Sequence, residues 1–250
     1  EHTYEVITFW DEIGGRRTTI DGKMVSQSRL AQLVRILWIT PLMDQIWLNG
    51  SAERRRFLDR IVSNLVPQHT ENLIKYYKAL KQRNRMIKDK VSDSNWFEAV
   101  EKEMVLSGVE IDKARQDVLT NIMEMQKRSV SSFPVANLQL IGTRFSSAQA
   151  FLSALRDNRR QDIFAGRTLI GPHLTDLCAV YSSKNINSKD CSTGEQKALL
   201  ISIIIATAKI QIEVFQIPPI LLFDEISAHL DEERRSMLYE ELDNLNVQVF

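Results

Sequence analysis

The spacing of apolar residues changes along the chain, and these changes outline its predicted organisation. Short runs rich in β-branched and aromatic residues predict strands, at 3–9, 17–20, 34–39, 138–141, 168–171, 177–181 and 247–250. Amphipathic or apolar stretches predict helices, at 28–33, 51–65, from about 69 to 90, 96–128, 147–158 and 232–242. Asp21–Gly22 predicts a hairpin turn. The mixture of both element types predicts an α/β protein.

The three longest predicted helices follow one another without an intervening strand. In the last of them, large apolar residues recur every seven positions, at Phe97, Met104, Ile111, Val118 and Met125. Smaller or polar residues lie between these positions, so we expect an antiparallel helical hairpin rather than a long coiled coil. The chain is therefore predicted to form an α/β lobe from residues 1–50 and 141–250, with a helical arm inserted at 51–140.

An unbroken apolar run from Ile220 to Phe223 stops at two adjacent carboxylates, Asp224 and Glu225. Without alternation, such a run predicts a strand buried on both faces, as in a parallel sheet. Ligands of such sheets bind at the carboxyl ends of the strands. Asp224 is therefore a candidate magnesium ligand, and Glu225 a candidate for polarising a water molecule. The alternative is a strand that ends in an acidic turn.

A second candidate site begins at Ser192, just before a long apolar stretch from Ala198 to Ile212. Ser192 and Glu195 have the spacing of a capping box, so a helix is predicted to begin at Ser192 or Thr193. Gly194 would let another backbone or a ligand approach the first turn. The free N–H groups of a helix start suit a phosphate. The alternative is an ordinary capped core helix.

These segments, followed by Ser227–Asp231, lie within about forty residues. In this order they resemble the core of ABC-type ATPases, with Ser192–Gln196 as the signature motif, Asp224 and Glu225 as Walker B, and Ser227–Asp231 as the D-loop. The stretch STGEQKALL at 192–200 resembles the RecF family of bacterial recombination mediators, as do the stretches at 50–60, 79–84 and 166–173. The resemblance covers nearly the whole chain from about Pro41 onward.

The resemblance implies an ABC-type ATPase lobe with a mixed, largely parallel sheet, and ATP-gated DNA binding in recombinational repair, replication restart and the SOS response. Asp224 and Glu225 would be catalytic, with Asp224 on Mg²⁺. ATP would be contacted by Ser192, Thr193, Gly194, Glu195, Gln196, Ser227 and Asp231. The implied partners are single- and double-stranded DNA, a second copy of the chain in an ATP-dependent homodimer, and RecR, with RecO and RecA.

A row of basic residues lies on the second helix of the predicted arm. Between Lys75 and Lys90 there are seven basic residues and a single acid, Asp89. Such a row binds phosphate backbones through counterion release, without sequence preference. The candidate DNA-binding residues are Lys75, Lys78, Lys81, Arg83, Arg85 and Lys88. The alternative is a charged face that is only solvated.

Composition and net charge exclude few classes of function. The 250 residues carry zero net charge, so any basic footprint must be local. The two cysteines, Cys178 and Cys191, lie far apart, which suits a reducing cytoplasm and offers no metal site. No apolar run reaches transmembrane length.

The chain departs from the resemblance at two places. It has no GxxxxGK[ST] loop, since Met24 follows Gly22–Lys23 where a hydroxyl residue is needed, so we expect a fragment whose Walker A lies upstream. Whether this chain hydrolyses ATP alone is therefore left open. Leu174 follows His173 where the family carries a basic residue. Two alternatives stay open: another ABC- or SMC-type ATPase, and a module that binds DNA or a partner without hydrolysis.

Overall fold

The computed structural model describes residues 3–11, 15–26, 29–30, 33–129, 133–145 and 147–250. Within them, the strands form three sheets of three strands each. The predicted helix at 28–33 falls partly outside the described residues.

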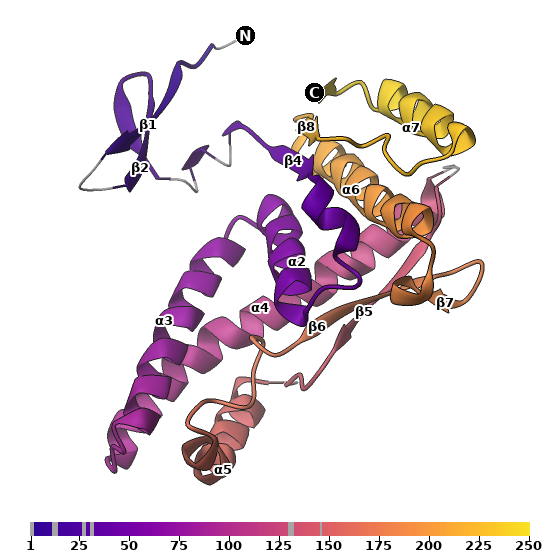
Figure 1. Ribbon diagram of the computed structural model, residues 1–250. Coiled ribbons are helices and arrows are strands. Elements are labelled where there is room, and N and C mark those ends of the chain that lie inside the picture. Colours follow the sequence, from indigo (N-terminus) through magenta and orange to yellow (C-terminus); the bar gives the residue numbers. More distant parts are fainter. Residues whose placement is uncertain (1–2, 12–14, 27–28, 31–32, 130–132, 146) are drawn as a thin grey trace.

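The first sheet is an antiparallel meander near the N-terminus. Its strands are β1 (Val6–Asp11), β2 (Gly15–Ile20) and β3 (Lys23–Val25). The predicted hairpin turn at Asp21–Gly22 joins β2 to β3, and both turn residues have positive φ. Figure 1 shows this sheet set apart from the rest of the chain, and Phe9 and Trp10 on β1 are exposed.

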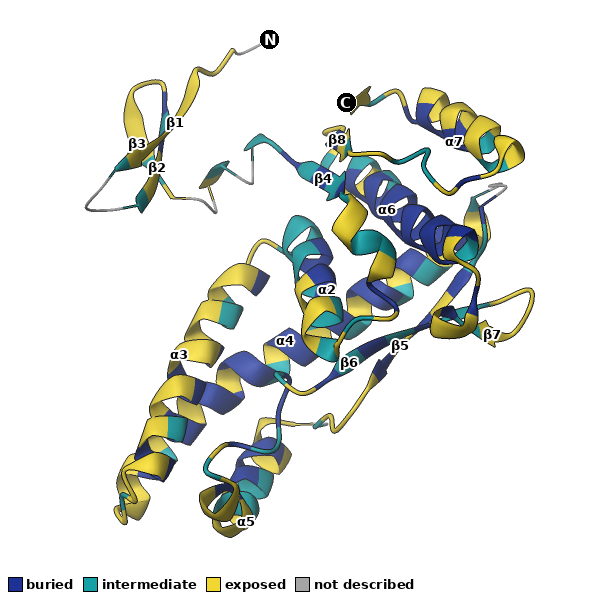
Figure 2. Ribbon diagram, in the orientation of Figure 1, coloured by how far each residue is buried: buried dark blue, intermediate teal, exposed yellow. Residues whose placement is uncertain are grey.

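The second sheet is parallel and holds the predicted apolar run. β8 (Ile220–Phe223) lies between β4 (Ile36–Ile39) and β9 (Gln248–Val249), with Leu37 opposite Leu221. The helix α6 (Thr193–Phe215) packs against it and is buried along nearly its whole length, as the dark blue ribbon of Figure 2 shows. The helix α7 (Glu232–Leu245) connects β8 to β9, as a parallel crossover requires.

The third sheet is antiparallel, with strand order β5 (Ala136–Ile141), β6 (Asp176–Tyr181) and β7 (Ile186–Asn187). The predicted strand at 177–181 is present as β6, but the predicted strand at 168–171 is not formed. The backbone N–H groups of Thr168 and Leu169 donate to side chains of Asn84 and Asp162 instead of to a neighbouring strand. β6 pairs with β5 rather than with β4 or β8.

Three predicted helices are present close to their expected bounds: α2 (Ser51–Leu65), α3 (His69–Lys88) and α4 (Ser94–Arg128). The helix predicted at 147–158 is also present, but it continues to residue 165 as α5 (Ala148–Ala165). α3 and α4 form the expected antiparallel hairpin (Figure 1). A short 3-10 helix, η1 (Pro41–Gln45), connects β4 towards α2.

Two separate apolar cores divide these helices differently from the predicted boundaries at 51 and 140. One core joins α2 and the C-terminal half of α4 to α6 and to the second and third sheets. The other core joins α3 and the N-terminal half of α4 to α5. By packing, α2 therefore belongs to the lobe, and α5 belongs to the arm.

Candidate functional site

The predicted carboxylates lie at the carboxyl edge of the parallel sheet. Asp224 follows the last residue of β8, and its backbone N–H donates to the carbonyl of Ile39 at 3.0 Å, which extends the pairing with β4 by one residue. Asp224 and Glu225 are both exposed. A cleft of about 480 Å³ borders Asp224 and is lined also by Trp38, Thr40 and Phe250. This is the place where ligands bind to parallel sheets.

A buried lysine fixes the backbone of Glu225. Lys197 is 1% exposed, and its Nζ donates to the Glu225 carbonyl at 2.9 Å and to Asp44 Oδ2 at 3.0 Å. Glu225 has φ of +50°, a left-handed conformation that L-residues adopt only where the surroundings hold it. Lys197 therefore joins three segments: the 3-10 helix η1, the first turns of α6 and the carboxylate turn.

The start of α6 has the predicted capping box. Ser192 is the N-cap, its Oγ accepts from the Glu195 N–H at 3.4 Å, and Glu195 Oε2 accepts from the Ser192 N–H at 2.9 Å. Lys184 also donates to Glu195. The hydrogen bond from Lys184, followed by that from the Ser192 backbone, lowers the pKa of Glu195 to about 2. Ser192 and Thr193 remain exposed at the helix start.

Two further residues of the predicted nucleotide set, Gly194 and Gln196, have structural roles. Gln196 is 3% exposed; its amide donates to the Cys191 carbonyl at 3.1 Å, and its own carbonyl accepts from Trp47 Nε1 at 3.1 Å. A Cβ on Gly194 would lie 2.9 Å from the carbonyl oxygen of His229. Gly194 therefore admits the backbone of the 227–231 loop, not a ligand, and Gln196 supports the turn rather than facing solvent.

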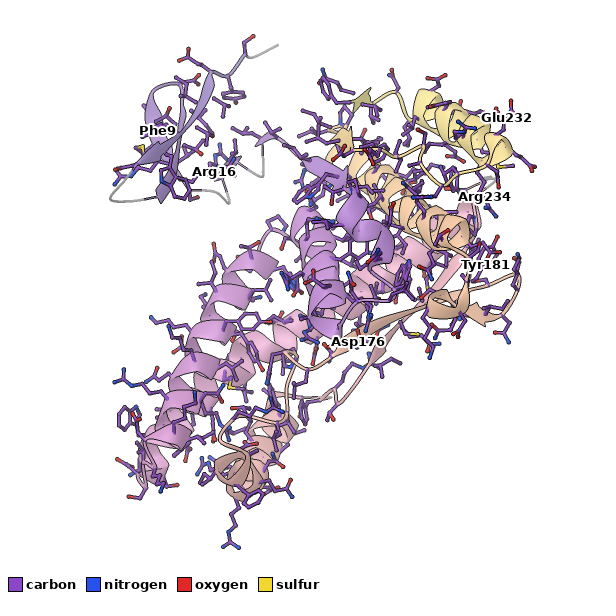
Figure 3. The ribbon with its side chains drawn as sticks, in the orientation of Figure 1. Phe9, Arg16, Asp176, Tyr181, Glu232 and Arg234 are labelled. Atoms are coloured by element: carbon purple, nitrogen blue, oxygen red, sulfur yellow. The ribbon has the colours of Figure 1, made fainter. Side chains whose placement is uncertain are left out.

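Asp231 acts as the N-cap of α7. Its Oδ1 accepts from the Arg234 N–H at 2.8 Å, and its Oδ2 pairs with Arg234 Nη1 at 3.1 Å. Figure 3 labels Arg234 on α7. Ser227 is half-buried in the same loop. The structure thus brings the predicted signature and D-loop segments together through Gly194 and His229, and it joins the signature helix to Walker B through Lys197.

The basic row of α3 is exposed with one exception. Lys75, Lys78, Lys81, Arg85 and Lys88 are solvent-exposed. Arg83 is fully buried and is not available to a phosphate backbone, so its prediction as a DNA-binding residue is wrong. The reason is visible in the sequence: apolar residues stand three, four and seven positions from Arg83, at Tyr76, Ala79, Leu80, Met86 and Ile87, so Arg83 lies in the middle of the buried stripe.

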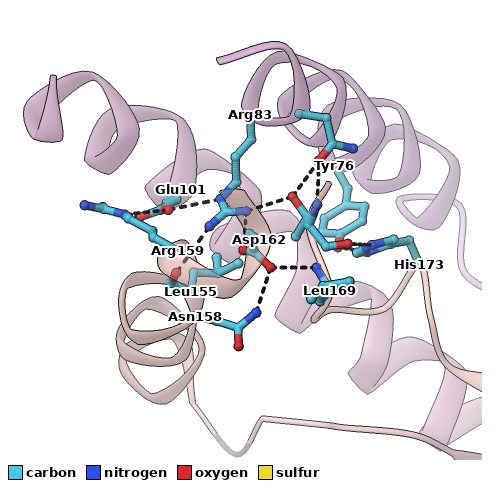
Figure 4. Close-up of polar contacts among 11 residues, drawn as sticks. Tyr76, Arg83, Glu101, Leu155, Asn158, Arg159, Asp162, Leu169 and His173 are labelled. Carbon is cyan, nitrogen blue, oxygen red and sulfur yellow. Dashed lines mark hydrogen bonds and ion pairs between the residues drawn. The ribbon is translucent and has the colours of Figure 1, made fainter. Parts of the chain in front are cut away.

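Arg83 instead holds the arm together from within. Its guanidinium donates to Glu101 on α4 at 3.0 Å, and to Asp162 on α5 at 2.7 Å (Figure 4). It also donates to Thr168 Oγ1 at 2.8 Å. The remaining oxygens of the two carboxylates accept from Arg159 and Asn158, so the buried charges are paired and hydrogen-bonded.

Beside this network, His173 closes the turn after Gly171. His173 Nδ1 lies 2.7 Å from the Tyr76 hydroxyl, and burial lowers the pKa of His173 to about 4. Gly171 has φ of +128°, and a Cβ there would lie 2.4 Å from the Tyr76 hydroxyl, so only glycine fits. These contacts give His173 a structural role in the turn.

A second buried pair was not predicted. Arg115 on α4 donates to both oxygens of Asp59 on α2, at 2.8 and 2.9 Å, and to the Pro172 carbonyl at 2.7 Å. His69 Nε2 lies 2.9 Å from Asp59. Apolar residues four before and three and four after Arg115 mark its buried position, as they do for Arg83.

No protein-family model matches the chain. Among curated proteins, the chain is 41% identical over 249 residues to the DNA replication and repair protein RecF of Mesorhizobium japonicum, covering 95% of this chain and 66% of that protein. It is 38% identical over 251 residues to the protein of the same name from Allorhizobium ampelinum, covering 96% of this chain and 67% of that protein. The chain belongs to the RecF family.

Solved structures agree with this assignment at the level of the fold. The recombination mediator protein RecF-ATP in the RecFOR pathway superposes with a TM-score of 0.80 at 19% identity, covering 95% of this chain and 67% of that chain. RecF-ATPrS of the same pathway superposes with a TM-score of 0.82 at 19% identity, covering 99% and 70%. The ABC-type ATPase fold is confirmed. The chain spans about two thirds of the length of the RecF proteins that it matches.

Two findings complete the picture of this RecF-family chain. Among the described residues, no group of three or more His, Cys, Asp or Glu side chains is placed to hold a metal ion by itself. Within the same residues, one helix, Thr193–Phe215, is long and apolar enough to cross a membrane, but 72% of its most apolar window is buried inside the structure. That helix is the central core helix α6.

Proposed function

We propose that this RecF-family chain is part of an ATP-dependent DNA-binding protein of recombinational repair and replication restart. The observation that carries the proposal is the contact of buried Lys197 with the backbone of Glu225, because it joins the carboxylates at the sheet edge to the helix that begins after Ser192. A change at either end of this connection would be transmitted to the other. The names of the curated relatives support a role in DNA replication and repair.

The residues at the sheet edge fit a magnesium ion. Mg²⁺ takes oxygen ligands and is usually held by one or two carboxylates together with substrate phosphates and water, so it needs no larger protein cluster. Asp224 is exposed beside the cleft of about 480 Å³ and would hold the ion. When bound to ATP, the ion neutralises charge on the transferred phosphoryl group. Glu225 would orient the attacking water and accept its proton.

We further propose an ATP-dependent homodimer in which Ser192 and Thr193 of one copy face the nucleotide of the other. The exposed side of this helix start supports the idea, because these two residues are not covered by their own lobe. Ser227 is also proposed to contact the nucleotide. Gln196 and Asp231 would act by holding their loops, since their polar atoms are already hydrogen-bonded within the chain. DNA, RecR, RecO and RecA as partners, and the cytoplasm as location, remain part of the proposal.

The test is Glu225→Gln in the full-length protein. This substitution keeps the size of the side chain but removes the base, so the ATP-bound dimer should accumulate while ATP turnover falls. Size-exclusion chromatography with ATP and a phosphate-release assay measure the two effects. Glu240→Gln on the exposed side of α7 is the control. Unchanged ATP turnover in Glu225→Gln would remove Glu225 from the role of base.

One observation favours a second candidate function, DNA binding that does not depend on nucleotide. The exposed basic row lies on α3, which belongs to the arm core and not to the core of the parallel sheet. Nothing in that arrangement requires ATP for a phosphate backbone to reach the lysines. Equal affinity for DNA with and without ATP and magnesium would favour this function over the gated one.

A further inference from the structure

A cleft between α3 and α4 lies beside the exposed basic row of the arm. It holds about 230 Å³, and the residues that line it include Lys78, Ala79, Gln82, Trp96, Val100 and Glu103. Lys78 and Gln82 are four residues apart and share one face of α3. Lys75 and Arg85, three positions before Lys78 and three after Gln82, lie on the same face and are exposed. The cleft therefore opens within the row that is proposed to bind DNA.

The wall and floor of the cleft differ in chemistry. Ala79 and Val100 are buried and form an apolar floor. Trp96 is 49% exposed, so much of its indole is open to solvent. Within the described part of the chain, the side chains of Lys78, Gln82 and Trp96 make no hydrogen bond or ion pair. Their polar atoms are thus free to serve a ligand.

We propose that this cleft is a binding site for one unpaired nucleobase of DNA, an inference that rests on the proposed DNA binding by the arm. An indole offers the flat surface on which any base can stack. The Gln82 amide can both donate to and accept from a base edge, and the Glu103 carboxylate can accept from an exocyclic amino group. Lys78 provides a positive charge for the adjoining phosphate.

The mixture of groups argues against an aliphatic ligand. An amide, an ammonium and a carboxylate around a single aromatic ring suit a planar ligand with several hydrogen-bonding atoms. A base within a paired duplex is stacked between its neighbours and cannot enter such a cleft without the cost of flipping out. The site therefore favours DNA that contains unpaired bases, while the lysines of the basic row serve paired and unpaired DNA alike.

The experiment compares three DNAs of equal length: a full duplex, a duplex with a short single-stranded gap, and the same gapped duplex with abasic nucleotides in the gap. The two gapped DNAs carry the same charge, so the comparison between them isolates the bases. Fluorescence anisotropy gives the affinity of the chain for each one. We expect the wild type to bind the gapped DNA about tenfold more tightly than the abasic one, the size of one base–aromatic stack. Trp96→Ala should abolish this difference and leave duplex affinity unchanged, whereas Trp96→Phe should retain most of it.

Matched variants distinguish a failure of the base-binding site from a failure of the DNA-binding proposal on which it rests. Trp10→Ala removes an exposed tryptophan from β1, far from the arm in Figure 1, and should change none of the three affinities. Replacement of Lys81 and Lys88 by glutamine should weaken binding to all three DNAs. If the wild type binds all three equally, or Trp96→Ala weakens all three equally, the base site is wrong and DNA binding stands. If the wild type binds none of them, both proposals are overturned.

Discussion

The sheet edge and the interior of the helical arm both concentrate charged side chains, but they use them in opposite ways. At the sheet edge, Asp224 and Glu225 are exposed. The buried amine of Lys197, on α6, donates to the backbone carbonyl of Glu225. Inside the arm, Arg83 is fully buried and pairs with carboxylates from two other helices. The exposed carboxylates are free for a ligand. The buried charges form ion pairs that hold the helices together.

This difference shows why charge alone does not identify a binding residue. Arg83 and Arg85 are two positions apart in the same basic row, yet one is 0% exposed and the other has a side chain that is 84% exposed. In a helix, residues two positions apart point in widely different directions. The face of the helix, rather than the number of charges, separates the residue that holds the arm from the one that is proposed to bind DNA.

Among the substitutions that test this comparison, Arg83→Ala is expected to have the largest effect on stability. Removing the guanidinium leaves Glu101 and Asp162 with reduced partners in the interior, which should cost about 3–5 kcal/mol of the free energy of unfolding. Urea unfolding measures this change. Arg85→Ala, on the exposed face, is the matched control and should stay within about 0.5 kcal/mol of the wild type. Equal losses in the two variants would contradict the assignment.

A smaller loss is expected from Lys197→Met at the sheet edge. The variant removes hydrogen bonds of a charged group to Asp44 and to the Glu225 carbonyl, which should cost about 2 kcal/mol. Because Glu225 is held in a left-handed conformation, amide exchange should also become faster at 223–231. Lys189→Met, at an exposed site, should change neither quantity. Unchanged exchange in Lys197→Met would show that the turn does not depend on this lysine.

Gly194→Ala tests the contact between the signature and D-loop segments. The added Cβ would meet the His229 carbonyl at 2.9 Å, so one backbone must shift, at a cost of about 1–2 kcal/mol. Gly50→Ala places its Cβ in open space and serves as the control. Thermal unfolding of both variants checks the difference. A stable Gly194→Ala with an unmoved 227–231 loop would rule out the close approach.

The smallest effect concerns pH and His173. Burial lowers the pKa of His173 to about 4 in the folded chain, so the folded state binds this proton at a lower pH than the unfolded state does. The resulting stability is present above the unfolded pKa of about 6.5 and is lost as pH falls towards 4, by about 1 kcal/mol at pH 5.5. His173→Gln cannot titrate, so its unfolding free energy should fall less than that of the wild type between pH 8 and 5.5. Parallel curves for the two proteins would contradict this role.

The parts of the structure that depend on nearby residues were predictable. The bounds of α2 and the capping box at Ser192 follow from local spacing, and the family resemblance identified the order of the motifs. The missing strand at 168–171 was not predictable in this way, because its amides bond to Asn84 and Asp162. Asn84 is 84 residues from Thr168 in the chain. The burial of Arg83 could have been predicted from the sequence, because the spacing of apolar residues on α3 places it in the middle of the buried face.

The central claim is that the exposed face of α3, without Arg83, binds the phosphate backbone. The most direct measurement is duplex affinity across a salt series for the wild type and for the chain with Lys75, Lys81 and Lys88 replaced by glutamine. Each lost phosphate contact should reduce the slope of log K against log salt by about 0.9, so the triple variant should lose up to about 2.7. A slope that is the same in both proteins would contradict the claim and place the DNA-binding surface elsewhere.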